Sequence, residues 1–281
     1  MTINQILSQY NKLLKFSSSP ILDVELLLCK TLNKPKEYIY EYPEKTLSAK
    51  QLALFKKLFN RCLAGEPIAY ILGHKEFYNL NLIVNKNVLI PRPETEILVE
   101  EVLKYCQTKK KILLIDLGCG SGAIGLACAK NLKNAEVFCT DTSASALKIA
   151  KQNARQLKAK INFFQGDLLL PCLKKGRLPV QLGNFIIVSN LPYLDTKEAA
   201  NSALKYEPKS ALDGGSDGLK YFRRLFNQIS HYNLKPQAIF LEIGFQQAKK
   251  VINIAKLTLP HYKFQTIKDL CGKDRVIKIT K

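Results

Sequence analysis

The chain has 281 residues, 47% of them hydrophobic, which is enough for one large and one smaller domain, each with a buried core. Its eight cysteines form no C-x-x-C pair and have no His cluster nearby, which argues against a disulfide framework or any metal site and favours the reducing cytoplasm. The formal net charge of +20 invites a nucleic-acid or ribosomal partner, but 36 of the 43 basic residues are lysines spread along the chain, so no dedicated nucleic-acid site is expected.

The first part of the chain is predicted to be a small helical domain over residues 1–75. Apolar residues recur with helical spacing over 2–16, 20–33, 35–42 and 48–64. Ser48 is the expected N-cap of the last of these helices, and Gly65 is its expected stop. The first helix mixes polar and apolar residues as an amphipathic helix does, unlike a signal peptide. Residues 112–129 carry few charges, but Asp116 and four glycines make them a poor membrane span, so no membrane segment is expected.

A β-hairpin is predicted to link this domain to the next over residues 76–93. Apolar residues alternate at Leu80, Leu82 and Val84, and again at Val88 and Ile90. The Asn-Lys-Asn segment at 85–87 lies between these two stretches. We expect the hairpin to turn there.

Strands and helices alternate in the rest of the chain, 94–281. Strands are expected near 112, 135, 161, 185 and 237, and helices near 122, 143, 218 and 246. This alternation predicts an α/β fold with a doubly wound, mostly parallel sheet. Residues 262–267 and 275–280 have no helix between them, so we expect them to form an antiparallel hairpin at the edge of the sheet.

The segment that begins at residue 111 has the pattern of a strand, a glycine-rich loop and a helix. Residues 111–116 have the composition of a buried parallel strand. The loop that follows contains Gly118, Cys119, Gly120, Ser121 and Gly122. Glycines there let the backbone approach a ligand closely, and the helix N-terminus offers unpaired N–H groups. A second strand ends in Asp141, where a carboxylate could accept both hydroxyls of a ribose, so the segment predicts an adenosine-binding site.

The same loop also satisfies the dinucleotide pattern G-x-G-x-x-G at 120–125, with Asp141 about 20 residues later. Two details favour S-adenosylmethionine over NAD. The glycines begin earlier, at Gly118, and the strand ends in Asp116, a carboxylate better suited to a cationic ligand than to a pyrophosphate. S-adenosylmethionine carries both an ammonium and a sulfonium group. The alternative is that the loop binds no ligand and that its glycines only allow the helix to pack closely on the strand.

Residues 190–193, Asn-Leu-Pro-Tyr, close the apolar run 185–189 and have the residue types that would hold a planar nitrogen. An amide or exocyclic amine is a poor nucleophile, so a catalyst must fix both N–H groups and aim the nitrogen at the methyl donor. The Asn190 side-chain oxygen and the Leu191 carbonyl could each accept one N–H. Pro192 stiffens the turn, and the Tyr193 ring could lie against the substrate plane. The alternative is a simple turn at the end of a strand.

The glycine loop and the turn together predict an amino-group methyltransferase. Four features each follow a strand of the expected sheet: the glycine loop that begins at Gly118, and the residues Asp141, Asp167 and Asn190. Because parallel strands end at the same edge, these residues should collect there. One pocket would then serve both the methyl donor and the substrate.

The chain resembles the release-factor glutamine methyltransferase family, also called HemK or PrmC, over nearly its whole length. Besides the loop and the turn, the matching stretches are 65–70 (Gly-Glu-Pro-Ile-Ala-Tyr), 90–96 (Ile-Pro-Arg-Pro-Glu-Thr-Glu) and 206–212 (Tyr-Glu-Pro-Lys-Ser-Ala-Leu). The 90–96 stretch is the most specific to the family. One departure is Leu191, where the family usually has proline. Since that position is thought to act through its carbonyl, leucine keeps the chemistry and loses some rigidity.

The resemblance implies a Rossmann-like methyltransferase domain over 94–281 and a helical substrate-docking domain at 1–75. It implies that the cofactor, S-adenosylmethionine, lies among residues 118–122, Asp141, Leu168 and Asn190, and we include Asp116 and Asp167 with them. It also implies that Asn190, Leu191, Pro192 and Tyr193 hold the substrate amide.

The turn does not distinguish a glutamine amide from an adenine amino group, since both present a planar NH₂. By resemblance, the favoured substrate is a class I peptide chain release factor, methylated on the glutamine of its Gly-Gly-Gln loop, and a ribosomal protein glutamine is the second. An adenine-specific DNA enzyme usually carries extra recognition sequence, for which this chain has no space. A non-catalytic adenosyl-ligand sensor that binds RNA through its lysines is the hypothesis from another class. We expect a cytoplasmic monomer.

Overall fold

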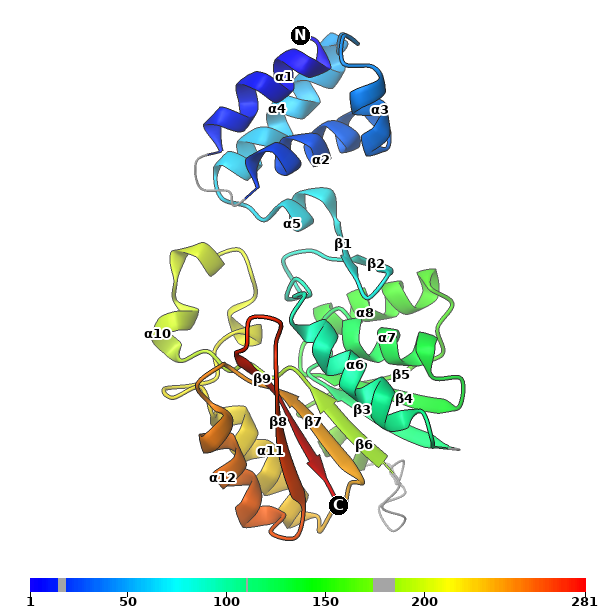
Figure 1. Ribbon diagram of the computed structural model, residues 1–281, viewed down its shortest axis with the longest axis vertical. Coiled ribbons are helices and arrows are strands. Elements are labelled where there is room, and N and C mark those ends of the chain that lie inside the picture. The colour runs from blue at the N-terminus through cyan, green and yellow to red at the C-terminus, as the bar shows by residue number, and fades with distance from the viewer. Residues whose placement is uncertain (15–18, 110, 174–184) are drawn as a thin grey trace. The chain divides into compact units, whose positions relative to one another are not determined.

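The computed structural model describes residues 1–14, 19–109, 111–173 and 185–281 (Figure 1). They divide into two compact units, Met1–His74 and Lys75–Lys281. Each unit is built around hydrophobic side chains of its own. The three-part division at 75 and 93, with a docking role for the first part, stays a prediction.

The unit Met1–His74 is helical, as its apolar spacing predicted. Its elements are α1 (Ile3–Tyr10), the 3₁₀ turn η1 (Asn11–Leu13), α2 (Pro20–Leu32), α3 (Lys36–Glu41), α4 (Ala49–Leu63) and α5 (Ile68–Leu72). The predicted first helix ends earlier than expected, in the 3₁₀ turn, and its last two residues lie outside the described part of the chain. Ser48 caps α4 as predicted, because its hydroxyl accepts from Gln51 N while the Gln51 side chain accepts from Ser48 N.

The core of this unit lies between the apolar faces of α1, α2 and α4. Leu27 on α2 and Phe55 and Phe59 on α4 are almost completely buried. The Tyr10 ring meets both phenylalanines edge to face, with centroid distances of 5.0 and 4.7 Å. The helices therefore bury a common core within their own unit.

The unit Lys75–Lys281 contains a seven-stranded sheet in the order β5-β4-β3-β6-β7-β9-β8. The strands are β3 (Ile112–Leu117), β4 (Ala135–Asp141), β5 (Asn162–Gln165), β6 (Phe185–Ser189), β7 (Ala238–Glu242), β8 (Lys263–Lys268) and β9 (Asp274–Thr280). β3 to β7 pair in parallel, and β9 inserts antiparallel between β7 and β8. The predicted α/β sheet and its terminal antiparallel hairpin are confirmed.

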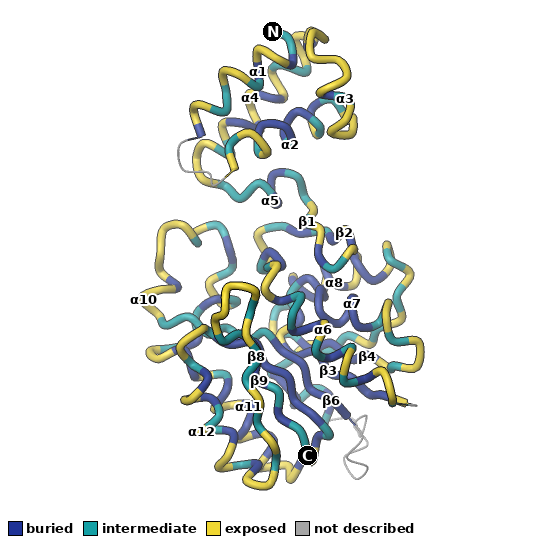
Figure 2. Tube along the Cα trace, viewed as in Figure 1, coloured by how far each residue is buried: buried dark blue, intermediate teal, exposed yellow. Residues whose placement is uncertain are grey.

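Helices cover both faces of this sheet, and the alternation along β3 shows why. Leu113, Ile115 and Leu117 pack in the core that includes α11 (Lys220–His231) and α12 (Ala248–Thr258). Ile112 and Leu114 belong to the opposite core, with α6 (Thr95–Cys106), α7 (Ala123–Asn131) and α8 (Ala144–Gln156). Alternate side chains of a strand point to opposite faces, so both faces of the central strands are buried (Figure 2). The remaining short helices are α9 (Leu170–Leu173), α10 (Thr196–Ala199) and the 3₁₀ turns η2 (Ser202–Leu204) and η3 (Lys209–Ala211).

A hairpin lies in this part of the chain, but the prediction that it turns at 85–87 was wrong. Its strands are β1 (His74–Phe77) and β2 (Leu80–Ile83), and it turns at Tyr78 and Asn79, which both have positive φ, 48° and 58°. Asn85 does form a local turn, with its side chain accepting from Asn87 N. The chain beyond it is not a strand, because Ile90 N donates to the Glu207 carboxylate and not to a partner strand.

Candidate active site

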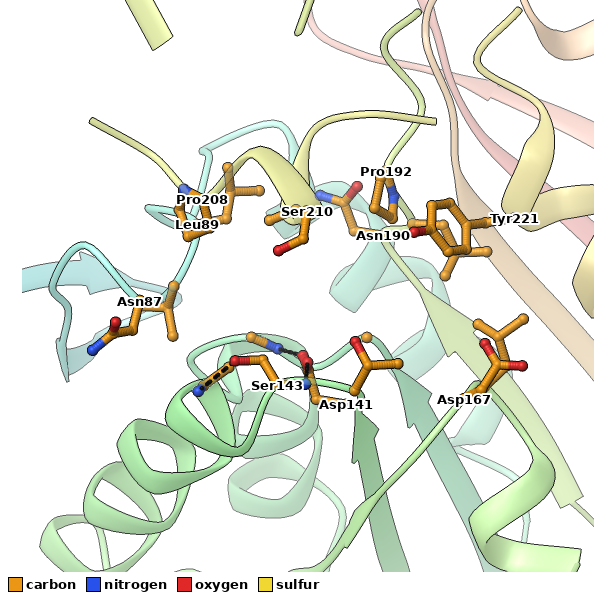
Figure 3. Close-up of a pocket in the computed structure, with 18 of the residues that line it drawn as sticks. Asn87, Leu89, Asp141, Ser143, Asp167, Asn190, Pro192, Pro208, Ser210 and Tyr221 are labelled. Carbon is orange, nitrogen blue, oxygen red and sulfur yellow. Dashed lines mark hydrogen bonds between the residues drawn. The ribbon is translucent and has the colours of Figure 1, made fainter. Parts of the chain in front are cut away.

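The ends of the parallel strands surround a cavity with about 710 Å³ of empty space, part of it open to solvent (Figure 3). Asp141, the last residue of β4, and Ser143 lie on one side of it, and Asn190 and Pro192, after β6, lie on the other. The full lining is residues 87–89, Gly118, Gly120, residues 141–143, Ala146, residues 166–168, residues 190–192, Pro208, Ser210, Ala211 and Tyr221.

The glycine loop reaches this cavity through Gly118 and Gly120. Gly120 has a φ of +54°, a backbone angle that residues other than glycine rarely adopt. A Cβ built on it would meet no atom within 4 Å. The loop therefore leaves open space beside its backbone, where a ligand can approach closely. On the other side, Leu191 packs over Gly118, so the loop and the turn after β6 meet directly.

Asp141 is held by the loop that it faces. Its Oδ2 accepts from Gly120 N at 2.9 Å, and its Oδ1 accepts from Ser143 N at 2.8 Å. Burial raises the pKa of this carboxyl, and the backbone donors oppose that rise. Each oxygen keeps a lone pair beyond these bonds, so the carboxylate can still accept two hydroxyl groups from the cavity side.

Asp116 lies beneath the loop and not among the residues described as lining the cavity. It is completely buried, and its Oδ2 accepts from Gly125 N at 2.9 Å. Burial raises the pKa of this carboxyl to about 7. Its Oδ1 has no hydrogen-bond partner among the described residues. Its predicted contact with a cationic ligand stays a prediction.

The other predicted loop residues face the protein. Cys119 N donates to Thr140 O at 3.0 Å, and Ser121 O accepts from the Asn153 side chain at 2.9 Å. A Cβ at Gly122 would press on Ala150 at 3.3 Å. Among the described residues these three hold the loop against β4 and α8, and the cavity lining does not include them.

Asp167 and Leu168 close one end of the cavity. Asp167 Oδ2 accepts from Gln228 Nε2 at 2.7 Å and pairs with Arg224 Nε at 2.8 Å, which ties it to α11. Leu168 has φ of +46° and is 6% exposed. Its side chain therefore contributes an apolar wall.

The turn 190–193 also lines a second cavity, with about 450 Å³ of empty space, part of it open to solvent. Asn190, Leu191 and Pro192 line both cavities, while Tyr193 and Arg92 line only the second. The structure therefore brings the glycine loop, Asp141 and the turn together at one edge of the sheet. Which atoms of ligand or substrate each of them contacts stays a prediction.

The turn is supported by residues that the sequence reading did not single out. Asn190 Nδ2 donates to Thr95 Oγ1 at 3.2 Å, and the Tyr193 hydroxyl lies 3.5 Å from Glu242 Oε1. Burial raises the pKa of Glu242 to about 7 and that of Tyr193 to about 12. Thr95 lies in the 90–96 stretch and Glu242 ends a strand. Their positions in that stretch and at that strand end were the only sequence features that could have drawn attention to them.

An ion pair joins the family-like stretches 90–96 and 206–212. The Glu207 carboxylate is buried, pairs with Arg92, and accepts from Ile90 N at 3.1 Å. It thus fixes 90–96 against 206–212, and Leu89 and Ala211 beside them line both cavities. The two stretches act as one wall of the site.

Two kinds of feature are missing from the described residues. No three His, Cys, Asp or Glu side chains gather there to hold a metal ion. None of the described helices has the length and apolar character needed to cross a bilayer.

Comparison with known proteins shows what the chain resembles. Residues 5–73 match the model of the PrmC N-terminal domain, and residues 93–206 match that of the methyltransferase small domain. The human METTL16 catalytic domain in complex with an RNA hairpin has a similar structure, with a TM-score of 0.56, 14% identity, and coverage of 78% of this chain and 81% of that one. The N-terminal domain of human METTL16 in complex with SAH gives 0.54 and 16%, covering 79% and 83%. At these identities the two structures show the fold alone.

Relatives of known family match almost the whole chain. The release factor glutamine methyltransferase of Coxiella burnetii is 39% identical over 93% of this chain and 92% of its own length. That of Koribacter versatilis is 38% identical over 99% and 98%. The relative from Bacillus anthracis is 34% identical over 90% of each chain. The chain belongs to the release factor glutamine methyltransferase family.

Proposed function

We propose that this protein transfers a methyl group from S-adenosylmethionine to the side-chain amide nitrogen of a glutamine in another protein. The favoured substrate is the Gly-Gly-Gln loop glutamine of a class I peptide chain release factor. The observation that carries the proposal is the place of the turn: Asn190, Leu191 and Pro192 line both cavities. A group in one cavity can thus meet a group in the other at Asn190.

The larger cavity fits an adenosyl ligand. Asp141 offers an acceptor for each ribose hydroxyl, since its oxygens are oriented by Gly120 N and Ser143 N and keep unused lone pairs. Apolar side chains of Ala146 and Leu168 line the same space and suit a flat aromatic base. When bound, the donor supplies a methyl group on a positively charged sulfur.

The smaller cavity fits a planar amide. Asn190 and Leu191 line it. We assign the Asn190 Oδ1 and the Leu191 carbonyl as the two acceptors that an NH₂ group needs to be fixed in orientation. Tyr193 and Leu212 supply flat and apolar walls. With both N–H groups held, the nitrogen lone pair is aimed at the donor cavity, and the surplus proton can leave after attack. Positioning is then the main catalytic contribution.

A protein substrate is favoured over a small molecule because of the helical unit. Seven of the eleven large hydrophobic side chains exposed among the described residues lie in Met1–His74: Leu13, Ile21, Leu22, Tyr40, Tyr42, Leu54 and Leu63. Exposed apolar side chains concentrated on one small unit favour contact with another protein. The release factors for which the relatives are named are the candidate partner, and the cytoplasm is the proposed location.

The test is methyl transfer from labelled S-adenosylmethionine to a purified class I release factor. Its Gln→Ala loop variant, a ribosomal fraction, duplex DNA and RNA are offered in parallel. We expect label on the release factor and none on the variant. Label only on the ribosomal fraction or only on nucleic acid would show that the substrate is a ribosomal component or a nucleic acid, and not a release factor. Tight binding of S-adenosylmethionine without label on any acceptor would favour a non-catalytic ligand sensor over an enzyme.

A further inference from the structure

A glutamine that lines neither cavity holds the turn 190–193 from behind. Gln247 follows β7 and stands directly before α12. Its Nε2 donates to Tyr193 O at 2.8 Å, and its Oε1 accepts from Gly244 N at 3.0 Å. Among the described residues, the lining of the two cavities does not include Gln247, whereas Tyr193 lines the smaller one. Gln247 therefore contacts the site through the backbone of Tyr193.

We propose that Gln247 is a positioning residue, whose side chain fixes the Tyr193 backbone and so sets where the Tyr193 ring stands beside the substrate amide. This inference rests on the proposed function, in which that ring is a flat wall of the amide cavity. Gln247 touches neither the methyl donor nor the substrate. It acts through the place of one aromatic ring.

The orientation of the Gln247 amide follows from its two partners. A backbone N–H group can only donate a hydrogen bond, and a backbone carbonyl can only accept one. Gly244 N must therefore face Oε1, and Tyr193 O must face Nε2. A flipped amide would set two donors against each other at Gly244 and two acceptors against each other at Tyr193. The bridge is thus satisfied in one orientation alone.

The bridge continues the pairing of two neighbouring strands past the edge of the sheet. β6 and β7 pair in parallel as far as Ser189 and Leu241. Tyr193 and Gly244 lie beyond that last pair, one on each segment. The Gln247 amide joins them with one acceptor and one donor, the groups that a neighbouring strand would offer. The turn after β6 is in this way tied to the segment after β7.

Two glycines leave the room that this bridge needs. A Cβ at Gly218 would lie 2.5 Å from Gln247 Nε2 and 2.2 Å from Tyr193 O. A Cβ at Gly244 would lie 3.1 Å from Gln247 Oε1 and 3.5 Å from Tyr193 Cδ2. Gly244 does not have a positive φ, so a side chain there would disturb the packing and not the backbone angle. The amide and the ring are therefore held in a closely packed place.

Capping of α12 does not account for the Gln247 side chain. Gln247 is the N-cap residue of that helix, but its side chain makes no capping hydrogen bond. Its backbone begins the helix, because Gln247 O accepts from Val251 N at 3.0 Å. Short side chains such as Ser, Thr, Asp and Asn are the ones favoured at an N-cap. The longer glutamine side chain is explained by the bridge to Tyr193.

The kinetic test separates the two ends of the bridge. Gln247→Glu keeps the length and an acceptor for Gly244 N, but it sets an oxygen against Tyr193 O. Gln247→Met keeps a side chain of similar length and loses both bonds. At pH 8, where the introduced carboxyl is ionised, both variants should lower kcat about 10-fold. The Kd of S-adenosylmethionine should stay within about twofold of wild type, because neither Gln247 nor Tyr193 lines the larger cavity.

A wild-type rate in Gln247→Glu would overturn the proposal, since it would show that the bond to Gly244 N is sufficient. Gln156→Glu is the matched control. Gln156 Nε2 donates to Asn81 O at 3.1 Å, from α8 of the same unit, and Gln156 lines neither cavity. The control loses the same kind of bond and gains the same charge, and its kinetic constants should match wild type. An equal loss of rate in Gln156→Glu would also overturn the proposal.

Coupling to Tyr193 separates positioning from general destabilisation. Gln247→Met should have almost no further effect on kcat in a Tyr193→Ala background, because the ring that it positions is already absent. Additive losses in the double variant would show that Gln247 acts on another group, and they would overturn the proposal.

A second readout does not depend on turnover. The ring ¹³C–¹H resonances of Tyr193, assigned by their loss in Tyr193→Ala, should shift in Gln247→Glu and in Gln247→Met. They should stay in place in Gln156→Glu. Unshifted Tyr193 resonances in both Gln247 variants would overturn the inference even for an active enzyme. Shifted resonances in a protein that methylates no glutamine would retain the positioning of the ring while the proposed function fails.

Discussion

Asn190 is the side-chain acceptor that we propose for the turn, and its contribution is open to a direct measurement. Replacing it by alanine removes one of the two groups proposed to fix the substrate NH₂ and leaves the glycine loop and Asp141 in place. We expect Asn190→Ala to lower kcat by about 10² to 10³, as loss of one positioned hydrogen-bond group does in other enzymes, with donor affinity largely unchanged. Single-turnover kinetics and a calorimetric titration of S-adenosylmethionine measure the two quantities.

Asn162→Ala, an exposed asparagine on β5, is the control for this experiment. Its kinetic constants should match wild type. Near-normal turnover in Asn190→Ala would contradict the role given to the turn, and a parallel collapse of donor affinity would move Asn190 from the substrate side to the donor side.

For Asp141 we expect the opposite result: its substitution should weaken binding of the methyl donor and not slow the chemical step. In Asp141→Asn one acceptor oxygen becomes an NH₂ that faces either Gly120 N or Ser143 N, so the substitution weakens both the loop and the ribose contact. Loss of a charged hydrogen bond corresponds to about a 10- to 100-fold rise in the donor Kd. Calorimetry measures it, with Asp274→Asn on β9 as the control for loss of a carboxylate. An unchanged Kd would show that the donor does not use Asp141.

At the scale of elements, the turn 190–193 is held from behind by the segment 213–218. A Cβ at Gly218 would lie 2.2 Å from Tyr193 O, which is backbone and cannot move without moving the turn. Gly218→Ala should therefore displace Tyr193 and lower kcat at least about tenfold, since small misplacements of a reacting group are costly. Gly272→Ala provides the matched control. Gly272 has φ of +76°, close to the +70° of Gly218, but meets nothing within 4 Å.

Both substitutions should lower the unfolding temperature through backbone strain, because alanine rarely adopts such φ values. Only Gly218→Ala should also impair methyl transfer. Equal kinetic losses in the two variants would attribute the effect to strain and not to the turn.

The glycine loop and its buried carboxyl predict a pH dependence of stability. The pKa of Asp116 is raised from 3.8 to about 7 in the folded protein, so its proton stabilises the fold below pH 4 and this stabilisation is lost as the pH rises to 7. Over that window the unfolding free energy of wild type should fall relative to Asp116→Asn by up to about 1.4 kcal/mol per pH unit. Asn keeps an acceptor for Gly125 N. Urea unfolding at pH 5, 6, 7 and 8 measures the difference, and parallel curves would mean that Asp116 is ionised in the fold.

The elements themselves were largely predictable because their signals are local. The run 185–189 and the Asp-Leu-Gly-Cys-Gly-Ser-Gly segment determine strand, loop and helix within a few residues, and Ser48 marks a helix start by its own side chain. The hairpin was misplaced because Tyr78 and Asn79 adopt positive φ without a glycine to signal it. The contacts of Asn190 with Thr95 and of Glu207 with Arg92 join residues about a hundred positions apart, and no local pattern predicts them.

At the scale of the molecule, the two units have separate cores. Every member of the helical core lies within Met1–His74, and the two cores on the sheet begin at Phe77. The exposed apolar side chains are concentrated in the helical unit, while the cavities and the turn lie in Lys75–Lys281. Under the proposed function, chemistry and partner recognition are therefore assigned to different parts of the chain.

This separation predicts what a fragment of residues 75–281 will do. Because no core residue of the sheet unit comes from the helical unit, the fragment should fold and bind S-adenosylmethionine with a Kd within about threefold of the full chain. It should lose at least about tenfold in kcat/KM toward an intact release factor, chiefly through KM, since the docking contacts are gone while the reacting groups remain. Toward a short peptide with the same glutamine loop, fragment and full chain should be equal. Equal activity on the intact protein would show that the helical unit does not dock the substrate, and loss of activity on the peptide would place part of the catalytic site in that unit.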